Sequence, residues 1–90
     1  MAWIVEFDPA AAKELRKLDP PIARRIVPFL RERLAVLDDP RSIGEALCGS
    51  ALGEYWKYRL GDHRVIARIV DRRVLIVVVR IGHRREVYRA

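Results

Sequence analysis

The sequence YWKYRLGDHRVIARIVDRRVLIVVVRIGHRREVY, residues 55–88, decides the fold, because strand-forming runs alternate in it with short turn signals. The third run is apolar at every position from Val74 to Val79, which predicts a central strand buried on both faces. We expect four strands, at 54–59, 63–70, 74–80 and 84–88. Turns at 60–62 and 71–73 and a bend at 81–83 separate them.

The chain before this sheet predicts one strand and two helices. Residues 2–7 are a β-branched and aromatic run that is typical of a strand. Asp8 and Asp19 each precede a proline. An Asp-Pro dipeptide favours the start of a helix, because aspartate caps the helix and proline fits its first turn. We expect a helical hairpin over about 9–37 that packs on the sheet, with a kink at Pro28, which lacks the N–H that would bond the Arg24 carbonyl.

Together these elements predict the fold class. Residues 40–53 are expected to form a loop with room for one short turn of helix. The whole chain, 1–90, is short enough for one domain with one core. We therefore expect an α+β domain: an N-terminal strand, a helical hairpin, and then a four-stranded, mainly antiparallel sheet.

The positive charge lies in the C-terminal half of the sequence. The chain has 18 Lys and Arg against 12 Asp and Glu, a net charge of +6. Residues 55–90 hold ten of these cations and three of the acids, whereas residues 1–54 hold eight and nine. A basic excess concentrated on one sheet is typical of a protein that binds a polyanion, and nucleic acid is the first candidate.

Other features exclude several classes of protein. The first residues, MAWIVEFDP, lack the basic and apolar regions of a signal peptide, and the longest apolar run is too short to span a bilayer. The single cysteine, Cys48, cannot form an internal disulfide and is expected to be a small loop or core residue. We expect a cytoplasmic protein without a membrane partner.

Basic side chains with aromatic residues between them suit an RNA surface, because cations neutralise phosphates and aromatic rings stack on bases. Strand alternation places Tyr55, Lys57 and Arg59 on one face and directs Trp56 and Tyr58 toward the core. A lone arginine is usually a solvated surface charge, but a cluster on one small sheet indicates binding. The remaining candidates are Arg64, Arg68, Arg84, Arg85, Tyr88 and Arg89.

The sequence predicts neither a metal site nor a cofactor. His63 and His83 are not joined by cysteines or carboxylates at the spacing of metal ligands. There is no glycine-rich phosphate loop, and no Ser-His-Asp arrangement stands out. Of the two histidines, His83 is the better candidate for a functional role, because it lies between Gly82 and Arg84 in the basic segment.

Three motifs carry a family resemblance: FDPAAAKELRKLD at 7–19, YWKYRLGDHRV at 55–65 and IGHRREVYR at 81–89. Together they resemble the RelE/ParE superfamily of toxins from type II toxin–antitoxin pairs, on the RelE side. The resemblance implies a compact α+β toxin that enters the ribosome and cuts mRNA there. It also implies a cognate antitoxin that wraps around the toxin and neutralises it.

The resemblance implies a site made of basic residues and a tyrosine. Matched motif by motif, its catalytic residues are Lys57, Arg64, Arg84 and Tyr88, and His83 is a further candidate. Some members of the superfamily have a second lysine two positions before the one at Lys57, where this chain has Tyr55. The resemblance therefore does not decide which residue acts as the general base. The residues expected to bind RNA around this set are Tyr55, Arg59, Arg68, Arg85 and Arg89.

Such a site suits attack of a ribose 2′-OH on the adjacent phosphorus, which leaves a 2′,3′-cyclic phosphate and a 5′-OH. Arg64 and Arg84 fit the stabilisation of the charge that develops on the phosphorus. Tyr88 or Lys57 could take the proton from the 2′-OH, and Arg84 or His83 could assist the leaving 5′-oxygen. The sequence does not separate these roles.

Two alternatives remain open at this level. A ParE-like toxin of the same fold would inhibit DNA gyrase without cutting RNA, although Lys57, Arg64, Arg84 and Tyr88 favour the nuclease. A small basic domain could also bind nucleic acid without catalysis. The ends of RNA after incubation with programmed ribosomes, and supercoiling by gyrase, distinguish these hypotheses.

Overall fold

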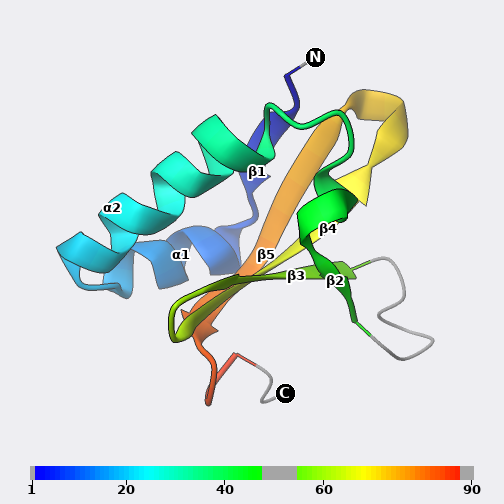
Figure 1. Cartoon of the computed structure of the whole chain (residues 1–90). Helices are drawn as coiled ribbons and strands as arrows, with labels where there is room; N and C mark the ends of the chain where they lie inside the picture. Colours follow the sequence, from blue (N-terminus) through cyan, green and yellow to red (C-terminus); the bar gives the residue numbers. More distant parts are fainter. Residues whose placement is uncertain (1, 48–54, 88–90) are drawn as a thin grey trace.

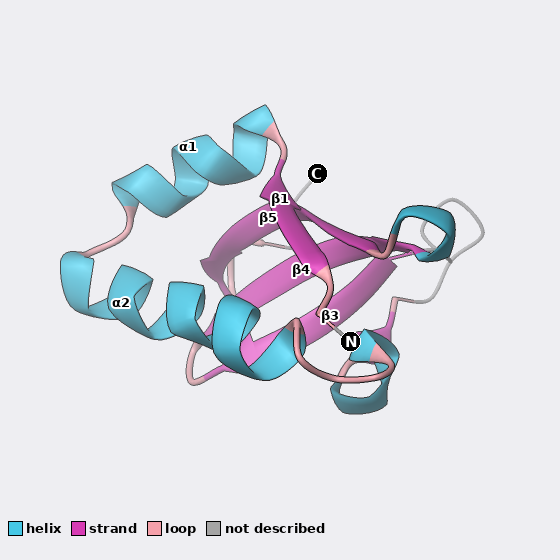
Figure 2. Ribbon diagram, turned by 90° about the horizontal axis from the view of Figure 1, so that it is seen from above, coloured by secondary structure: helices cyan, strands magenta, loops and turns pink. Residues whose placement is uncertain are grey.

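The protein is described from a computed structural model that covers residues 2–47 and 55–87 (Figure 1). Two helices lie along one face of a twisted sheet and leave its other face, called the outer face below, without a helix (Figure 2). Within these described residues, five strands form one sheet in the order β1-β5-β4-β3-β2. Their bounds are β1 Ile4–Phe7, β2 Glu45–Ala46, β3 Tyr55–Leu60, β4 His63–Val70 and β5 Leu75–His83.

The two helices begin where the Asp-Pro pairs predict them. Helix α1 spans Pro9–Lys17, and the Asp8 carboxylate accepts a hydrogen bond from the Ala11 N–H at 3.0 Å. Helix α2 spans Pro20–Pro28 and is preceded by Asp19, whose side chain makes no capping bond. The α+β class and the helical hairpin are therefore confirmed.

At Pro28, where the sequence predicts a kink, the structure shows a change in the hydrogen-bonding pattern of the helix. Proline cannot donate the bond that α geometry requires at this position. The helix continues as a π-helical turn over Phe29–Leu34, and the Ala35 N–H bonds the Leu30 carbonyl five residues earlier. This turn keeps Leu30 and Leu34 fully buried against the sheet.

The sheet is mainly antiparallel, as predicted. Strand β1 pairs in parallel with β5, and the other neighbours pair antiparallel. Strand β5 lies between β1 and β4, and its residues Leu75, Ile76 and Val78 are buried, which confirms the central position of this apolar run. Val77 and Val79 are only half-buried, so the prediction that the run is buried on both faces is wrong at these positions, because no helix covers the outer face.

The prediction of a last strand at 84–88 is wrong over the part that the structure describes. Strand β5 continues through the expected bend at 81–83, and residues 84–87 form turns. The His83 carbonyl accepts bonds from the N–H groups of Glu86 and Val87, while the Arg84 N–H bonds the Asp62 carbonyl. These local bonds use the groups that a further strand would need.

Two other boundaries differ from the prediction. The 40–53 segment contains a 3-10 turn at Pro40–Ile43, for which the sequence left room, and the short strand β2, which it did not predict. Val74, expected to begin a strand, has φ of 49° and follows a 3-10 turn at Asp71–Arg73. A β-branched residue is strained in this left-handed conformation, which allows the tight connection into β5.

Helix α1 also covers an open edge of the sheet. Strand β1 pairs with β5 only from Leu75 to Val78, and no other strand in the described part of the chain pairs with the rest of that edge. The Glu14 carboxylate accepts a hydrogen bond from the Ile81 N–H at 2.9 Å and pairs with the Arg80 guanidinium at 3.3 Å. This contact satisfies a backbone donor that would otherwise be left at a free edge.

Candidate nucleic-acid interface and catalytic site

Strand β3 separates the core side chains from the candidate site. Tyr58 is 1% exposed, and its ring centroid lies 6.1 Å from that of Phe29 on the helical side. Trp56 also packs against the core. Because strand side chains alternate, Tyr55, Lys57 and Arg59 lie on the outer face, as the sequence predicts.

Strand register adds two more predicted residues to this face. Arg59 lies opposite Arg64, and Tyr55 lies opposite Arg68. Residues directly opposite in an antiparallel pair project from the same face. The residues that share the outer face are therefore Tyr55, Lys57, Arg59, Arg64 and Arg68.

A carboxylate that the sequence patterns do not single out lies among these cations. Glu45 of β2 is directly opposite Lys57 in the register. Its carboxylate oxygens lie 3.5 Å from Lys57 Nζ and 3.2 Å from Arg59 Nε. The Lys57 side chain is 18% exposed, so this ion pair is partly shielded from water. No local pattern marks Glu45, because only the pairing of β2 with β3 brings it there.

Arg64 is held at the β3–β4 turn by its own backbone surroundings. Its Nη1 donates to the carbonyl oxygens of Gly61 and His63, each at 2.9 Å. Gly61 has φ of 59°, a conformation that suits glycine in this two-residue turn. These bonds orient the guanidinium before any ligand arrives.

Arg84 lies at the same end of the sheet. It follows β5, whose Gly82 is directly opposite Arg64. Its N–H bonds the Asp62 carbonyl at 2.8 Å, and its Nε lies 3.8 Å from the Asp62 carboxylate. The β3–β4 turn therefore anchors the backbone of Arg84, while its half-exposed side chain stays available to solvent.

His83 is placed apart from Lys57. It is opposite His63, which is in turn opposite Leu60, a half-buried residue that packs against the core. Both imidazoles therefore belong to the helical side of the sheet end. The two rings meet edge to face with centroids 5.7 Å apart, and the His83 Nδ1 accepts a bond from the Arg85 N–H. Arg85 is exposed beside it.

Three predicted positions lie outside the described residues: Cys48, Tyr88 and Arg89. Within 2–47 and 55–87, the arrangement combines fixed guanidinium groups, an ammonium and a carboxylate on one open face. Such a surface can bind phosphates and can also move a proton near them.

Comparison with known families decides the class of the chain. Residues 5–88 match the family model described as ParE toxin of type II toxin-antitoxin system, parDE. The chain belongs to the RelE/ParE superfamily of toxins. The match covers the helical hairpin and every described residue of the outer-face cluster. The resemblance inferred from the three sequence motifs is confirmed.

The relatives of this toxin are RelE-like. It is 32% identical over 89 residues to "Toxin RelG" of Mycobacterium tuberculosis, covering 99% of each chain. It is also 32% identical over 90 residues to "mRNA interferase toxin RelE" of Escherichia coli, covering 98% of this chain and 92% of that protein.

Solved structures agree with the sequence relatives. The toxin superposes on a chain of the M. tuberculosis RelBE2 toxin–antitoxin complex with a TM-score of 0.83 and 29% identity, covering 92% of both chains. It superposes on the isolated E. coli RelE toxin with a TM-score of 0.73 and 25% identity, covering 91% of this chain and 84% of that one. None of the helices that the structure describes is long and apolar enough to cross a membrane.

Proposed function

We propose that this toxin is a ribosome-dependent endoribonuclease that cuts mRNA and so stops translation. The observation that carries the proposal is the cationic outer face, where Lys57, Arg59, Arg64 and Arg68 gather and beside which Arg84 is anchored. The relative from E. coli is named an mRNA interferase, which supports the same activity here.

The proposed reaction is attack of a ribose 2′-OH on the adjacent phosphorus. The P–O bond to the 5′-oxygen breaks as the new P–O bond forms, leaving a cyclic phosphate and a 5′-OH. Arg64 suits stabilisation of the charge on the phosphorane, because two backbone carbonyls already hold its guanidinium in place. Arg84 suits the same role, because its backbone is anchored to Asp62 of the same turn.

The ion pair between Lys57 and Glu45 bears on which residue acts as the general base. Lys57 carries an ammonium that already pairs with a carboxylate, so it fits better as a charge partner for phosphate than as a proton acceptor. Glu45 supplies a carboxylate beside it that could take the 2′-OH proton. We therefore add Glu45 to Tyr88 as a candidate base. For assisting the leaving 5′-oxygen, Arg84 fits better than His83, because the register places His83 on the helical side of the sheet.

We also propose an antitoxin partner that covers the outer face and blocks access of RNA. Structural relatives of this toxin have been solved as complexes with antitoxins, including those of M. tuberculosis and E. coli. The site of action would be the cytoplasm, where ribosomes and mRNA are found.

The test is primer extension on mRNA bound to programmed ribosomes, with purified toxin and with its Arg64→Ala variant. The wild type should produce new 5′ ends within the ribosome-covered region, and Arg64→Ala should produce few. Thermal melting of both proteins shows whether the variant is folded. Absence of cleavage by the folded wild type would reject the proposal.

A second candidate function has its own support. The matching family model is that of ParE toxins, and inhibition of DNA gyrase is the alternative that the sequence leaves open for this fold. A gyrase supercoiling assay with the same preparation separates the two. Blocked supercoiling without RNA cleavage would assign the toxin to the gyrase-directed class.

A further inference from the structure

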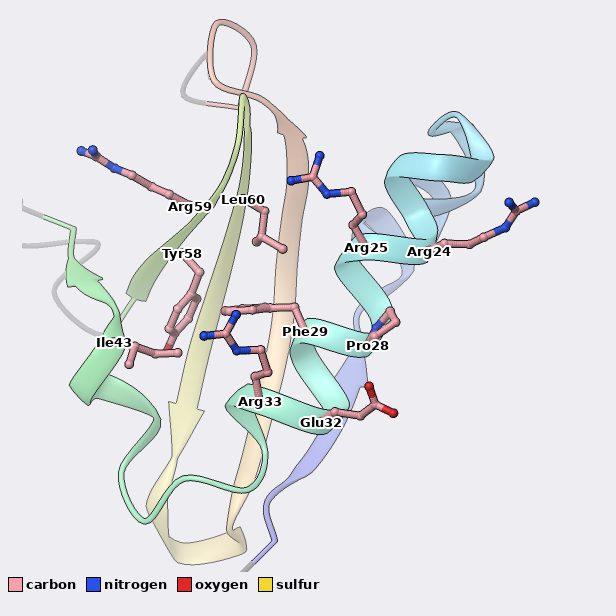
Figure 3. A pocket seen from close by; sticks show the side chains of 10 residues that line it. All are labelled: Arg24, Arg25, Pro28, Phe29, Glu32, Arg33, Ile43, Tyr58, Arg59 and Leu60. Carbon is pink, nitrogen blue, oxygen red and sulfur yellow. The ribbon is translucent and has the colours of Figure 1, made fainter.

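A second cationic region lies on the other side of β3, against helix α2 and the π-helical turn that continues it. It surrounds a cavity of about 540 Å³, here called the α2–β3 pocket (Figure 3). This volume is in the range of small-ligand sites. Its lining residues are Arg24, Arg25, Pro28, Phe29, Glu32, Arg33, Ile43, Tyr58, Arg59 and Leu60.

Two of the four arginines point into this space. Figure 3 shows the guanidinium groups of Arg25 and Arg33 directed from the helix toward β3, whereas Arg24 and Glu32 point away from it. Neither Arg25 nor Arg33 forms an ion pair with another residue in the described part of the chain. Two guanidinium groups that face one cavity without a carboxylate partner are a site for an anion.

The floor of the pocket is apolar. In Figure 3 the Phe29 ring lies between Arg25 and Arg33, and it is tilted by 57° against the buried Tyr58 ring. Leu60 is half-buried, and Ile43 at the rim is 48% exposed. An aromatic face beside guanidinium groups suits a nucleotide, because the base can stack while the phosphate is bound.

The pocket connects with the proposed cleavage site through one turn. A Cβ placed on Gly61 would lie 3.7 Å from Arg25 Nη2, so this guanidinium lies beside the β3–β4 turn. The carbonyl of the same Gly61 accepts the bond from Arg64. Arg25 on the helical side and Arg64 on the outer side therefore flank a single glycine.

We propose that the α2–β3 pocket binds RNA phosphodiester groups next to the chain segment held at the cleavage site. This proposal rests on the proposed function and extends it to a second contact region. A polyanion that crosses the β3–β4 turn meets Arg64 and then Arg25, and Arg33 lies farther along the helix. The outer-face cations and the pocket cations follow one another across the β3–β4 turn. This arrangement favours RNA over an acidic protein segment, because successive phosphates of one RNA strand can bind first one region and then the other. The RNA could be the message or ribosomal RNA, which present the same chemistry.

The experiment compares two double variants that each remove two positive charges. Arg25→Gln/Arg33→Gln changes the pocket. Arg72→Gln/Arg73→Gln changes two exposed arginines of the β4–β5 turn, outside both the pocket and the outer-face cluster, and serves as the matched control. The probes are a short single-stranded 2′-O-methyl RNA, which cannot be cut because its nucleophile is blocked, and purified ribosomes programmed with mRNA. Binding is measured over a range of salt concentrations.

The pocket variant should bind RNA more weakly than the wild type and the control. The plot of log affinity against log salt concentration should become less steep, by about 0.7 for each phosphate of a single strand that the variant no longer neutralises. Weaker binding of both probes supports the message as the ligand, and weaker binding of ribosomes alone supports ribosomal RNA.

The proposal is overturned if the pocket variant matches the control on both probes. It is also overturned if the variant keeps both RNA affinities but loses binding to its purified antitoxin, since the pocket would then serve an acidic protein. Failure of the cleavage proposal has a different signature. A wild type that binds RNA through the pocket but never cuts on the ribosome would reject the nuclease and leave the pocket in place.

Discussion

The Tyr58 hydroxyl donates a hydrogen bond to the Pro40 carbonyl oxygen at 2.8 Å. This bond joins the middle of β3 to the 3-10 turn Pro40–Ile43, which leads directly into β2 and Glu45. A buried aromatic residue on the helical side thus helps to place a carboxylate on the outer face. The stability of this contact and the geometry of the site are therefore linked.

Tyr58→Phe should lower the free energy of unfolding by about 1–3 kcal/mol at neutral pH, because a buried carbonyl loses its donor. Burial raises the pKa of Tyr58 from 10.0 to about 12. The neutral hydroxyl therefore stabilises the fold fully below pH 10, and this contribution is lost as the pH rises through about 12.

The phenylalanine variant lacks this titration, so the stability gap between the two proteins should narrow as the pH rises from 10 to 12. Urea unfolding of both proteins at neutral and alkaline pH measures the gap. A gap that stays constant over this interval would contradict the placement of the buried hydroxyl.

Gly44→Ala should destabilise the protein by about 1–3 kcal/mol, as over-packing of a core does. The added Cβ would lie 2.8 Å from Tyr58 Cε1 and 3.1 Å from its Cζ, and the core holds that ring. Gly82→Ala is the matched control, because its Cβ would meet Val87 at an ordinary 3.8 Å. Thermal melting should show a clear drop for Gly44→Ala and little change for Gly82→Ala; equal melting temperatures would contradict the tight contact.

Glu45→Gln should slow cleavage by roughly 10²–10⁴-fold if the carboxylate accepts the 2′-OH proton. The same change should strengthen binding of a 2′-O-methyl RNA, because it removes the negative charge beside Lys57 and Arg59. Single-turnover cleavage and binding are measured separately for this reason. Glu6→Gln, at an exposed position of β1, is the control.

These opposite effects distinguish a chemical role from a structural one. General loss of structure would weaken binding and slow cleavage together. A folded Glu45→Gln protein that cuts at close to the wild-type rate would leave Tyr88 as the candidate base.

Arg84→Ala should reduce cleavage on the ribosome by about 10²–10³-fold, the usual cost of removing one fixed donor to a transition state. The fold should remain intact, because the backbone N–H of residue 84 keeps its 2.8 Å bond to the Asp62 carbonyl. The lost side-chain ion pair with Asp62, at 3.8 Å, is exposed and contributes little to stability. Primer extension measures the rate, and Arg73→Ala controls for the loss of one exposed positive charge. Equal cleavage by Arg84→Ala and Arg73→Ala would remove this arginine from the site.

Local patterns in the sequence determined much of the architecture. The Asp-Pro pairs predicted both helix starts, because capping and the restricted φ of proline act within a few residues. Alternation along β3 separated Lys57 from Tyr58, since successive strand side chains point to opposite faces. These signals need no knowledge of the rest of the fold.

The three-dimensional fold decided the rest of the site. Glu45 meets Lys57 only through the pairing of β2 with β3, and Arg25 reaches Gly61 only because the fold brings this helical residue beside the β3–β4 turn. The last predicted strand was wrong because turn hydrogen bonds to the His83 carbonyl compete with extension of the sheet. Such contacts join residues far apart in the chain or depend on strand register, and neither is encoded by local conformational preference. The sequence alone therefore determined which cations the toxin carries and on which strand face they lie, and the tertiary structure decided which carboxylate and which second cationic region accompany them.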